Sequence, residues 1–119
     1  MDVRSLAAAE PFVTADGSTI RELCGLPTGG TGNQSLAEAT LEPGQATQRH
    51  YHREAEEIYF VLEGEAEMEL EGDRARVDPG MAIPIPPGSR HQMRNVGAGP
   101  LRILCCCSPP YRHEDTYFD

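Results

Sequence analysis

The segment from residue 44 to residue 64, GQATQRHYHREAEEIYFVLEG, constrains what the chain can fold into more than any other. Successive side chains of a β-strand point to opposite faces, so His50 and His52 share one face while Tyr51 points away. A second strand-prone run, in which inward and outward positions alternate, begins at Glu57. Two imidazoles and a carboxylate suit a divalent transition metal such as Mn, Fe, Ni or Zn.

A second segment offers a further histidine. From residue 80 to residue 95, GMAIPIPPGSRHQMRN, a strand-like run ends at the turn Pro86-Pro87-Gly88, and a new run starts at His91. The prolines of this segment lack a donor N–H, so we expect no regular central ladder there. His91 is the candidate for a fourth ligand.

Together the two segments resemble the two conserved motifs of the cupin superfamily. The first motif is Gly, five residues, His-x-His, four residues, Glu, six residues and Gly. The second is Gly, five residues, Pro-x-Gly, two residues, His, three residues and Asn. The chain fills these positions with Gly44, His50, His52, Glu57, Gly64, Gly80, Pro86, Gly88, His91 and Asn95.

The resemblance covers about residues 35–109. It implies an all-β fold, the double-stranded β-helix (cupin or jelly-roll) barrel, with a metal at its wide end. In cupins the residues that match His50, His52, Glu57 and His91 are the metal ligands.

The resemblance leaves the reaction open, because one scaffold serves many functions. Three imidazoles and one carboxylate leave two adjacent positions on an octahedral metal for a substrate or dioxygen. This favours a small metal-dependent enzyme of dioxygenase, isomerase or lyase type, acting on a small carboxylate, enol or sugar-like compound. The alternative is a non-catalytic metal-dependent binding or sensing module, which is favoured by the lack of an evident general base besides the ligands.

Two polar side chains outside the ligand set are candidates for positioning a substrate. Tyr59 shares the strand face of Glu57, and Gln48 shares that of His50. A solvent-facing strand end explains Gln48 equally well. Five arginines fall on outward strand faces: Arg49, Arg74, Arg76, Arg94 and Arg102. Arg90 is the exception, in a turn at the barrel mouth. We therefore expect the metal itself to hold a small anionic or polyoxygenated ligand.

The strand that begins near Glu57 also defines an outer surface. Spacing to Gly64 selects Glu57 over its neighbour Glu56, and a one-residue slip would turn every side chain to the other face. This choice leaves an apolar row outside, consisting of Ile58, Phe60 and Leu62. The N-terminal hairpin or a second subunit has to cover that row. The cupin resemblance favours the second subunit, so we expect a homodimer.

Turn residues and alternation predict two further hairpins. Phe12–Thr14 and Ser18–Leu23 flank a turn at Asp16-Gly17. Alternate glutamates from Glu65 to Glu71 indicate a solvated strand face. A two-residue turn at Gly72-Asp73 would pair these glutamates with the arginines of the next strand.

The cysteines fit neither a disulfide framework nor a zinc ribbon. If Arg102 points outward, Cys105 and Cys107 face inward and Cys106 faces outward with Arg102. The pattern favours small buried apolar side chains. The alternative is an inward thiol close to the metal or the substrate.

The 119 residues suit one domain with a modest core. We expect a single cupin domain over residues 1–119, made of an N-terminal arm and hairpin (1–34), a barrel core with both motifs (35–109) and a C-terminal tail (110–119). The twelve glycines and ten prolines supply the turns that many short strands require.

The charge balance excludes several function classes. A net charge of −9 disfavours a nucleic-acid partner, because phosphate binding relies on clustered cations. All ten basic residues are arginines, so lysine Schiff-base chemistry is excluded. The sequence has no apolar run near the roughly 20 residues that span a bilayer and no secretory signal pattern. We therefore expect a cytoplasmic protein without a membrane partner.

Overall fold

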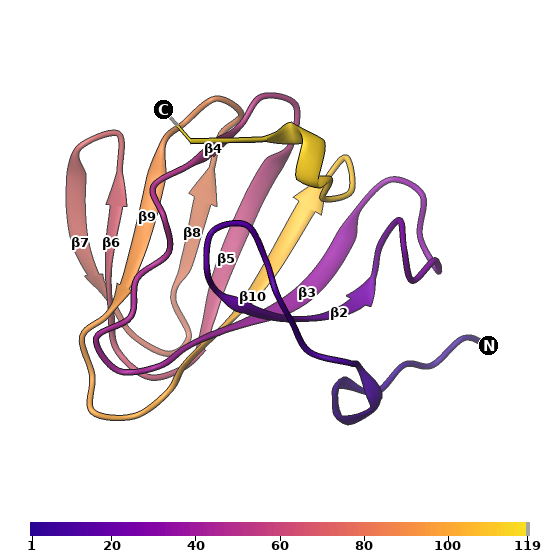
Figure 1. The fold of residues 1–119 in the computed structure, drawn as a ribbon, viewed down its shortest axis with the longest axis horizontal. Coiled ribbons are helices and arrows are strands. Elements are labelled where there is room, and N and C mark those ends of the chain that lie inside the picture. Colours follow the sequence, from indigo (N-terminus) through magenta and orange to yellow (C-terminus); the bar gives the residue numbers. More distant parts are fainter. Residues whose placement is uncertain (119) are drawn as a thin grey trace.

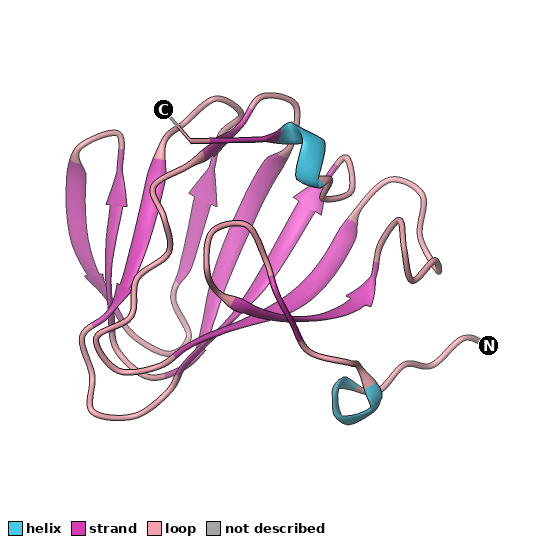
Figure 2. Ribbon diagram, viewed as in Figure 1, coloured by secondary structure: helices cyan, strands magenta, loops and turns pink. Residues whose placement is uncertain are grey.

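The computed structural model describes residues 1–118, and Asp119, the last residue of the predicted tail, lies outside the described residues. Nearly all regular elements are strands (Figure 2), which confirms the all-β prediction. The described helices are the short 3₁₀ turns η1 (Leu6–Ala8) and η2 (His113–Asp115). Among residues 1–118, no helix has the length and apolarity to cross a membrane.

The strands follow the turns of the sequence closely. They are β1 (Phe12–Val13), β2 (Thr19–Cys24), β3 (Ser35–Leu41), β4 (Tyr51–His52), β5 (Glu56–Glu63), β6 (Ala66–Leu70), β7 (Asp73–Val77), β8 (Ala82–Ile85), β9 (His91–Asn95), β10 (Leu101–Ser108) and β11 (Thr116–Tyr117).

The strands form two main antiparallel sheets and one small one. The larger sheet has the order β1-β2-β3-β10-β5-β8, the smaller has the order β7-β6-β9, and β11 pairs with β4. The two main sheets enclose one apolar core (Figure 1), in which Val61 and Met93 are fully buried. The proline-bearing strand β8 lies at a sheet edge, paired with β5, as the missing N–H groups require.

Strand β5 has the register that the motif spacing predicts. Glu57, Tyr59 and Val61 are buried, whereas Glu56 is exposed. The apolar row on the other face stays open, with Ile58 and Phe60 exposed by 42% and 37%. The choice of Glu57 over Glu56 as the inward carboxylate is therefore confirmed.

The predicted turn between β6 and β7 is wrong by one position. The turn residues are Glu71 and Gly72, which both have positive φ (48° and 90°), and Glu69 pairs with Arg74. A two-residue hairpin turn of this kind needs left-handed backbone at both positions, and glycine meets that need best at the second. The register moves by two residues, so every side chain keeps its predicted face.

Two terminal segments complete the barrel. The hairpin of β1 and β2 has the predicted turn around Asp16-Gly17, and its loop crosses in front of the barrel (Figure 1). The main-chain N–H of Gln48 donates to the carbonyl of Asp16 over 2.7 Å, which ties this turn to the first motif. The C-terminal segment lies against β4 through β11.

Candidate metal centre

Four motif side chains converge at one end of the barrel. His50 and His52 come from the chain at β4, Glu57 from β5 and His91 from the start of β9. Backbone hydrogen bonds in both directions, of 3.0 and 2.8 Å, join His50 to His91. The two motifs are therefore fixed to each other by the main chain, independently of any bound ion.

The ligand atoms of these side chains lie close together. One nitrogen from each of His50, His52 and His91 lies within 4.8 Å of the others. Glu57 Oε1 lies 3.4 Å from His52 Nε2 and 3.5 Å from His91 Nε2. All four residues are at most 5% exposed.

Each imidazole has its outer nitrogen bound to the backbone. Nδ1 of His50 lies 2.7 Å from the carbonyl of Gln48, and that of His91 lies 2.9 Å from the carbonyl of Ser89. Nδ1 of His52 lies 3.2 Å from the carbonyl of Asp115. A carbonyl only accepts, so each Nδ1 carries the hydrogen, and in the neutral rings each Nε2 lone pair faces the centre.

Two buried acceptors at the centre have no hydrogen-bond partner among the described residues. They are Glu57 Oε1 and His91 Nε2. Buried polar atoms without a partner are rare and costly. A cation between them would satisfy both, and nitrogen and oxygen donors fit a divalent transition metal. The residues present thus fit such an ion.

The buried groups of the centre shift one another's pKa values. Burial raises the pKa of Glu57, but the nearby imidazoles of His52 and His91 outweigh it and hold the pKa well below its usual range. Burial lowers the pKa of His52, and the nearby carboxylate of Glu57 reverses this, so the net shift is upward. Burial, with the neighbouring His91, lowers the pKa of His50.

The inward cysteines lie at the site. Cys107 Sγ donates to Glu57 Oε2 over 3.2 Å, and Cys105 lines the same cavity. Burial and the charge of Glu57 raise the pKa of Cys107, so it remains a thiol. The geometry corresponds to the alternative of an inward thiol near the site, and Arg102 points outward to Glu38 and Glu63.

The two candidate positioning residues, Tyr59 and Gln48, lie in different surroundings. Tyr59 is 3% exposed, lines the cavity and lies edge-on to His91 with ring centroids 5.7 Å apart. The side chain of Gln48 is exposed and does not line the cavity, which corresponds to the solvent-facing alternative. Residues 47–49 have no regular strand geometry, so strand parity does not hold there, and Thr47 faces the cavity instead.

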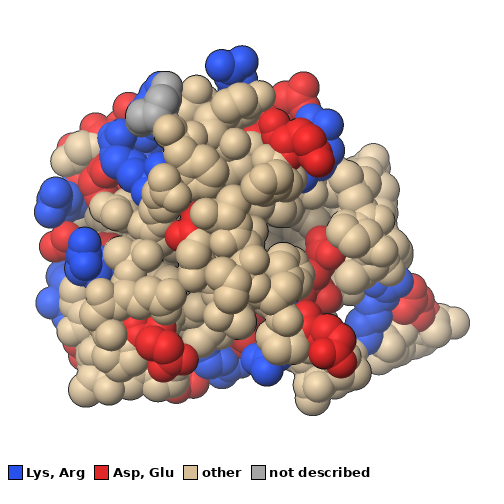
Figure 3. Space-filling view, viewed as in Figure 1, with Lys and Arg blue, Asp and Glu red and all other residues tan. Residues whose placement is uncertain are grey.

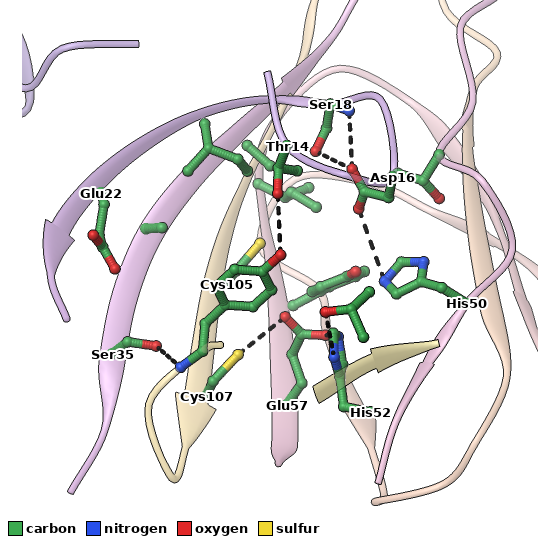
Figure 4. A pocket seen from close by; sticks show the side chains of 18 of the residues that line it. Thr14, Asp16, Ser18, Glu22, Ser35, His50, His52, Glu57, Cys105 and Cys107 are labelled. Carbon is green, nitrogen blue, oxygen red and sulfur yellow. Dashed lines mark hydrogen bonds and ion pairs between the residues drawn. The ribbon is translucent and has the colours of Figure 1, made fainter. Parts of the chain in front are cut away.

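Two acidic residues at the site lie outside both motifs. Asp16, in the turn between β1 and β2, has its Oδ2 3.8 Å from His50 Nε2 (Figure 4). Asp115, in η2, is buried and binds the loop between His52 and Glu57. The sequence marked Asp16 only as a turn residue and gave no signal for Asp115.

Three of these four side chains, those of His50, His52 and Glu57, line a cavity between the hairpin and the barrel. Its volume is about 60 Å³, several times the roughly 10–15 Å³ that one water molecule requires. Within the described part of the chain, none of the arginines lines it. The guanidinium of Arg90 lies 4.3 Å from the ring centroid of Tyr51 instead. Charged side chains lie mostly around the rim of the face in Figure 3.

Comparisons with known proteins agree with this architecture. The cupin domain family model matches residues 37–107. The uncharacterized protein MJ1618 of Methanocaldococcus jannaschii is 47% identical over 90% of this chain and 86% of that protein. Polyketide synthase CurC of Streptomyces cyaneus is 36% identical over 78% of this chain and 60% of that protein.

A solved structure shows the same barrel. A protein from Planctomyces limnophilus is 31% identical and superposes with a TM-score of 0.83, covering 99% of this chain and 96% of that chain. The family match, the relatives and the shared barrel agree with the two motifs, and the chain belongs to the cupin family, with its double-stranded β-helix fold.

Proposed function

We propose that the protein is a small metal-dependent enzyme. His50, His52, Glu57 and His91 would hold a divalent ion of Mn, Fe, Ni or Zn. The substrate would be a small carboxylate, enol or sugar-like compound bound in the adjoining cavity.

One observation carries the proposal. Glu57 Oε1 and His91 Nε2 are buried, have no hydrogen-bond partner within residues 1–118 and lie 3.5 Å apart at one end of the barrel. Fixed Nδ1–H groups on the three histidines direct the remaining lone pairs to the same point. A set of acceptors without a donor is favourable only if a cation binds there.

The chain contributes binding, orientation and exclusion of water. When bound, a metal of this kind supplies Lewis-acid activation of a substrate oxygen, and redox chemistry if it is iron. The apolar cavity wall excludes water from the substrate. Tyr59 and Asp16 place a hydroxyl and a carboxylate beside the ligand set, where each can make a hydrogen bond to the substrate.

Asp16 also bears on the choice between an enzyme and a binding module. The sequence offered no basic group apart from the four ligands, and this favoured binding without turnover. The structure brings the carboxylate of Asp16, which is not among the four candidate ligands, to the cavity. Similarity to CurC, which is named a polyketide synthase, supports an enzymatic role.

The test starts from protein purified without added metal. Elemental analysis should find about one transition metal ion per chain, as expected for one closed ligand set. A screen of small acids, enols and sugars should then show turnover, with oxygen uptake if the metal is iron. Metal binding with no turnover across the screen would instead identify a binding or sensing module, and protein without metal would contradict the proposal.

A further inference from the structure

The turn between β1 and β2 brings a carboxylate to the cavity from outside the conserved motifs. Asp16 Oδ2 lies 3.8 Å from His50 Nε2, and the side chain is only 13% exposed. Figure 4 shows this carboxylate pointing from the hairpin toward His50. The position is on the cavity side of the ligand set, where a bound small molecule would be.

Hydrogen bonds fix the orientation of this carboxylate. Oδ1 accepts from the backbone N–H of Ser18 over 2.9 Å and from its hydroxyl over 2.6 Å. Two hydrogen bonds hold the turn itself. The backbone N–H of Gln48 donates to the carbonyl of Asp16, and the side-chain amide of Gln45 donates to the carbonyl of Gly17. These bonds occupy Oδ1 and leave Oδ2 directed at the cavity.

The remaining cavity wall offers anions no counter-charge. Carboxylates of Asp16, Glu22 and Glu57 line it, and among residues 1–118 it contains no arginine. Most of the other lining side chains are apolar, including Phe12, Ile20, Leu41, Leu101 and Ile103. A dianion would meet the charge of Asp16 at short range, whereas a hydroxyl group would donate to it and satisfy it.

We infer that Asp16 contacts the ligand and selects an uncharged compound, with an apolar body and adjacent hydroxyl or enol groups, over a small dicarboxylate. The inference rests on the proposed metal site and narrows its ligand class. It assigns Asp16 a role in specificity that the four metal ligands do not provide.

The test uses zinc-loaded protein and two probes that both present adjacent oxygens to a metal. Catechol is uncharged at neutral pH with an apolar ring, and oxalate is a dianion. Calorimetric titration should give wild-type protein an affinity for catechol about tenfold or more above that for oxalate. Asp16→Asn keeps Oδ1 as the acceptor for Ser18 but replaces Oδ2. Its affinity for catechol should therefore be about tenfold lower than that of wild type, and its affinity for oxalate should be equal or higher.

Two further variants separate recognition from folding. Asp73→Asn, at an exposed position in β7, should bind both probes as wild type does. Ser18→Ala removes one hydrogen bond to Oδ1 while Asp16 stays in place. It should lower the affinity for catechol by about two- to fivefold without changing the affinity for oxalate. Zinc content and melting temperature are measured for each protein, and Ser18→Ala decides the result if Asp16→Asn does not fold.

The outcomes that contradict the inference are distinct from failure of the metal site. Equal affinities for the two probes in wild type, or unchanged catechol binding in a folded Asp16→Asn, would overturn the role of Asp16 alone. A wild-type protein that retains no zinc would overturn the proposed metal site, and this inference with it.

Discussion

Among single residues, Cys107 shows how the barrel orients a candidate ligand. Its thiol donates to Glu57 Oε2, which leaves Oε1 turned toward His52 and His91. Because burial and the nearby carboxylate raise the pKa of Cys107, the proton stays on sulfur. We therefore expect Cys107 to act as a positioning residue through Glu57, without itself binding the metal.

Substitutions of Cys107 should separate the hydrogen bond from the packing. Cys107→Ser keeps a donor, so zinc affinity should stay within about twofold of wild type, whereas Cys107→Ala should lose about tenfold, as for other partners of metal ligands. Cys106→Ala, on the opposite face of β10, is the control and should change nothing. Competition with a chromophoric chelator measures the affinities, and equal affinity in Cys107→Ala and wild type would refute the role.

Among the elements, the C-terminal segment fixes the loop between two candidate ligands. The Asp115 carboxylate accepts hydrogen bonds from the backbone N–H groups of Arg53, Glu54 and Ala55. The backbone carbonyl of Asp115 accepts a hydrogen bond from Nδ1 of His52. One residue of the tail therefore stabilises both the loop and the orientation of an imidazole.

Removal of the Asp115 carboxylate should lower both the stability of the fold and the affinity for metal. Asp115→Ala leaves partly buried N–H groups without acceptors, so the free energy of unfolding should fall by about 2–3 kcal/mol. Zinc affinity should fall as well, because the loop before Glu57 loosens. Glu114→Ala, at an exposed neighbour, is the control in urea denaturation and chelator competition. Indistinguishable behaviour of the two variants would show that the tail is not needed for the site.

Strand β6 carries a surface ion pair with a defined pH dependence. A hydrogen bond from Arg49, at 2.6 Å, lowers the pKa of Glu69. A pKa that is lower in the folded than in the unfolded state contributes stability above the unfolded pKa, and that stability is lost as the pH falls through the folded pKa.

The variant Glu69→Gln tests the direction of this pH dependence of stability. Arg49 is partly exposed and water screens the pair, so the variant should lose less than about 1 kcal/mol of unfolding free energy at neutral pH. The difference from wild type should shrink as the pH falls through the lowered pKa of Glu69, because wild type then loses the charge as well. Urea unfolding over a series of pH values from neutral to acid measures it, and a loss that grows on acidification would contradict the assignment.

For the whole molecule, the outer face of β5 predicts self-association. Ile58, Phe60 and Met81 are 42%, 37% and 46% exposed on neighbouring segments. The N-terminal hairpin does not cover them, because β1 and β2 lie at the opposite end of the larger sheet. We propose that a second copy of the chain covers this face, since large apolar patches are uncommon on monomers.

Light scattering over a wide concentration range checks the homodimer. Wild type should have twice the mass of the chain, and Phe60→Glu should be monomeric while it keeps its metal, because a charge there opposes apolar contact. Glu63→Gln, at the exposed end of the same strand, is the control. A monomeric wild type, or a dimer unaffected by Phe60→Glu, would remove this interface.

The sequence predicted the barrel and the convergence of the four motif residues because both depend on local patterns. Fixed spacing placed Glu57 inward, and strand parity also placed Tyr59 and Cys107 at the site. The same parity failed for Gln48, where the backbone leaves strand geometry. Asp16 and Asp115 reach the site only through the packing of terminal segments, and no local pattern encodes that packing.

The most direct test of the metal centre compares two adjacent glutamates in protein purified without added metal. Glu57→Gln keeps the shape of an inward ligand but removes its charge, whereas Glu56→Gln changes an exposed side chain of the same strand. Elemental analysis should find about one metal ion per chain in wild type and in Glu56→Gln, and a strongly reduced content in Glu57→Gln. Full metal content in Glu57→Gln, or no metal in wild type, would contradict the account.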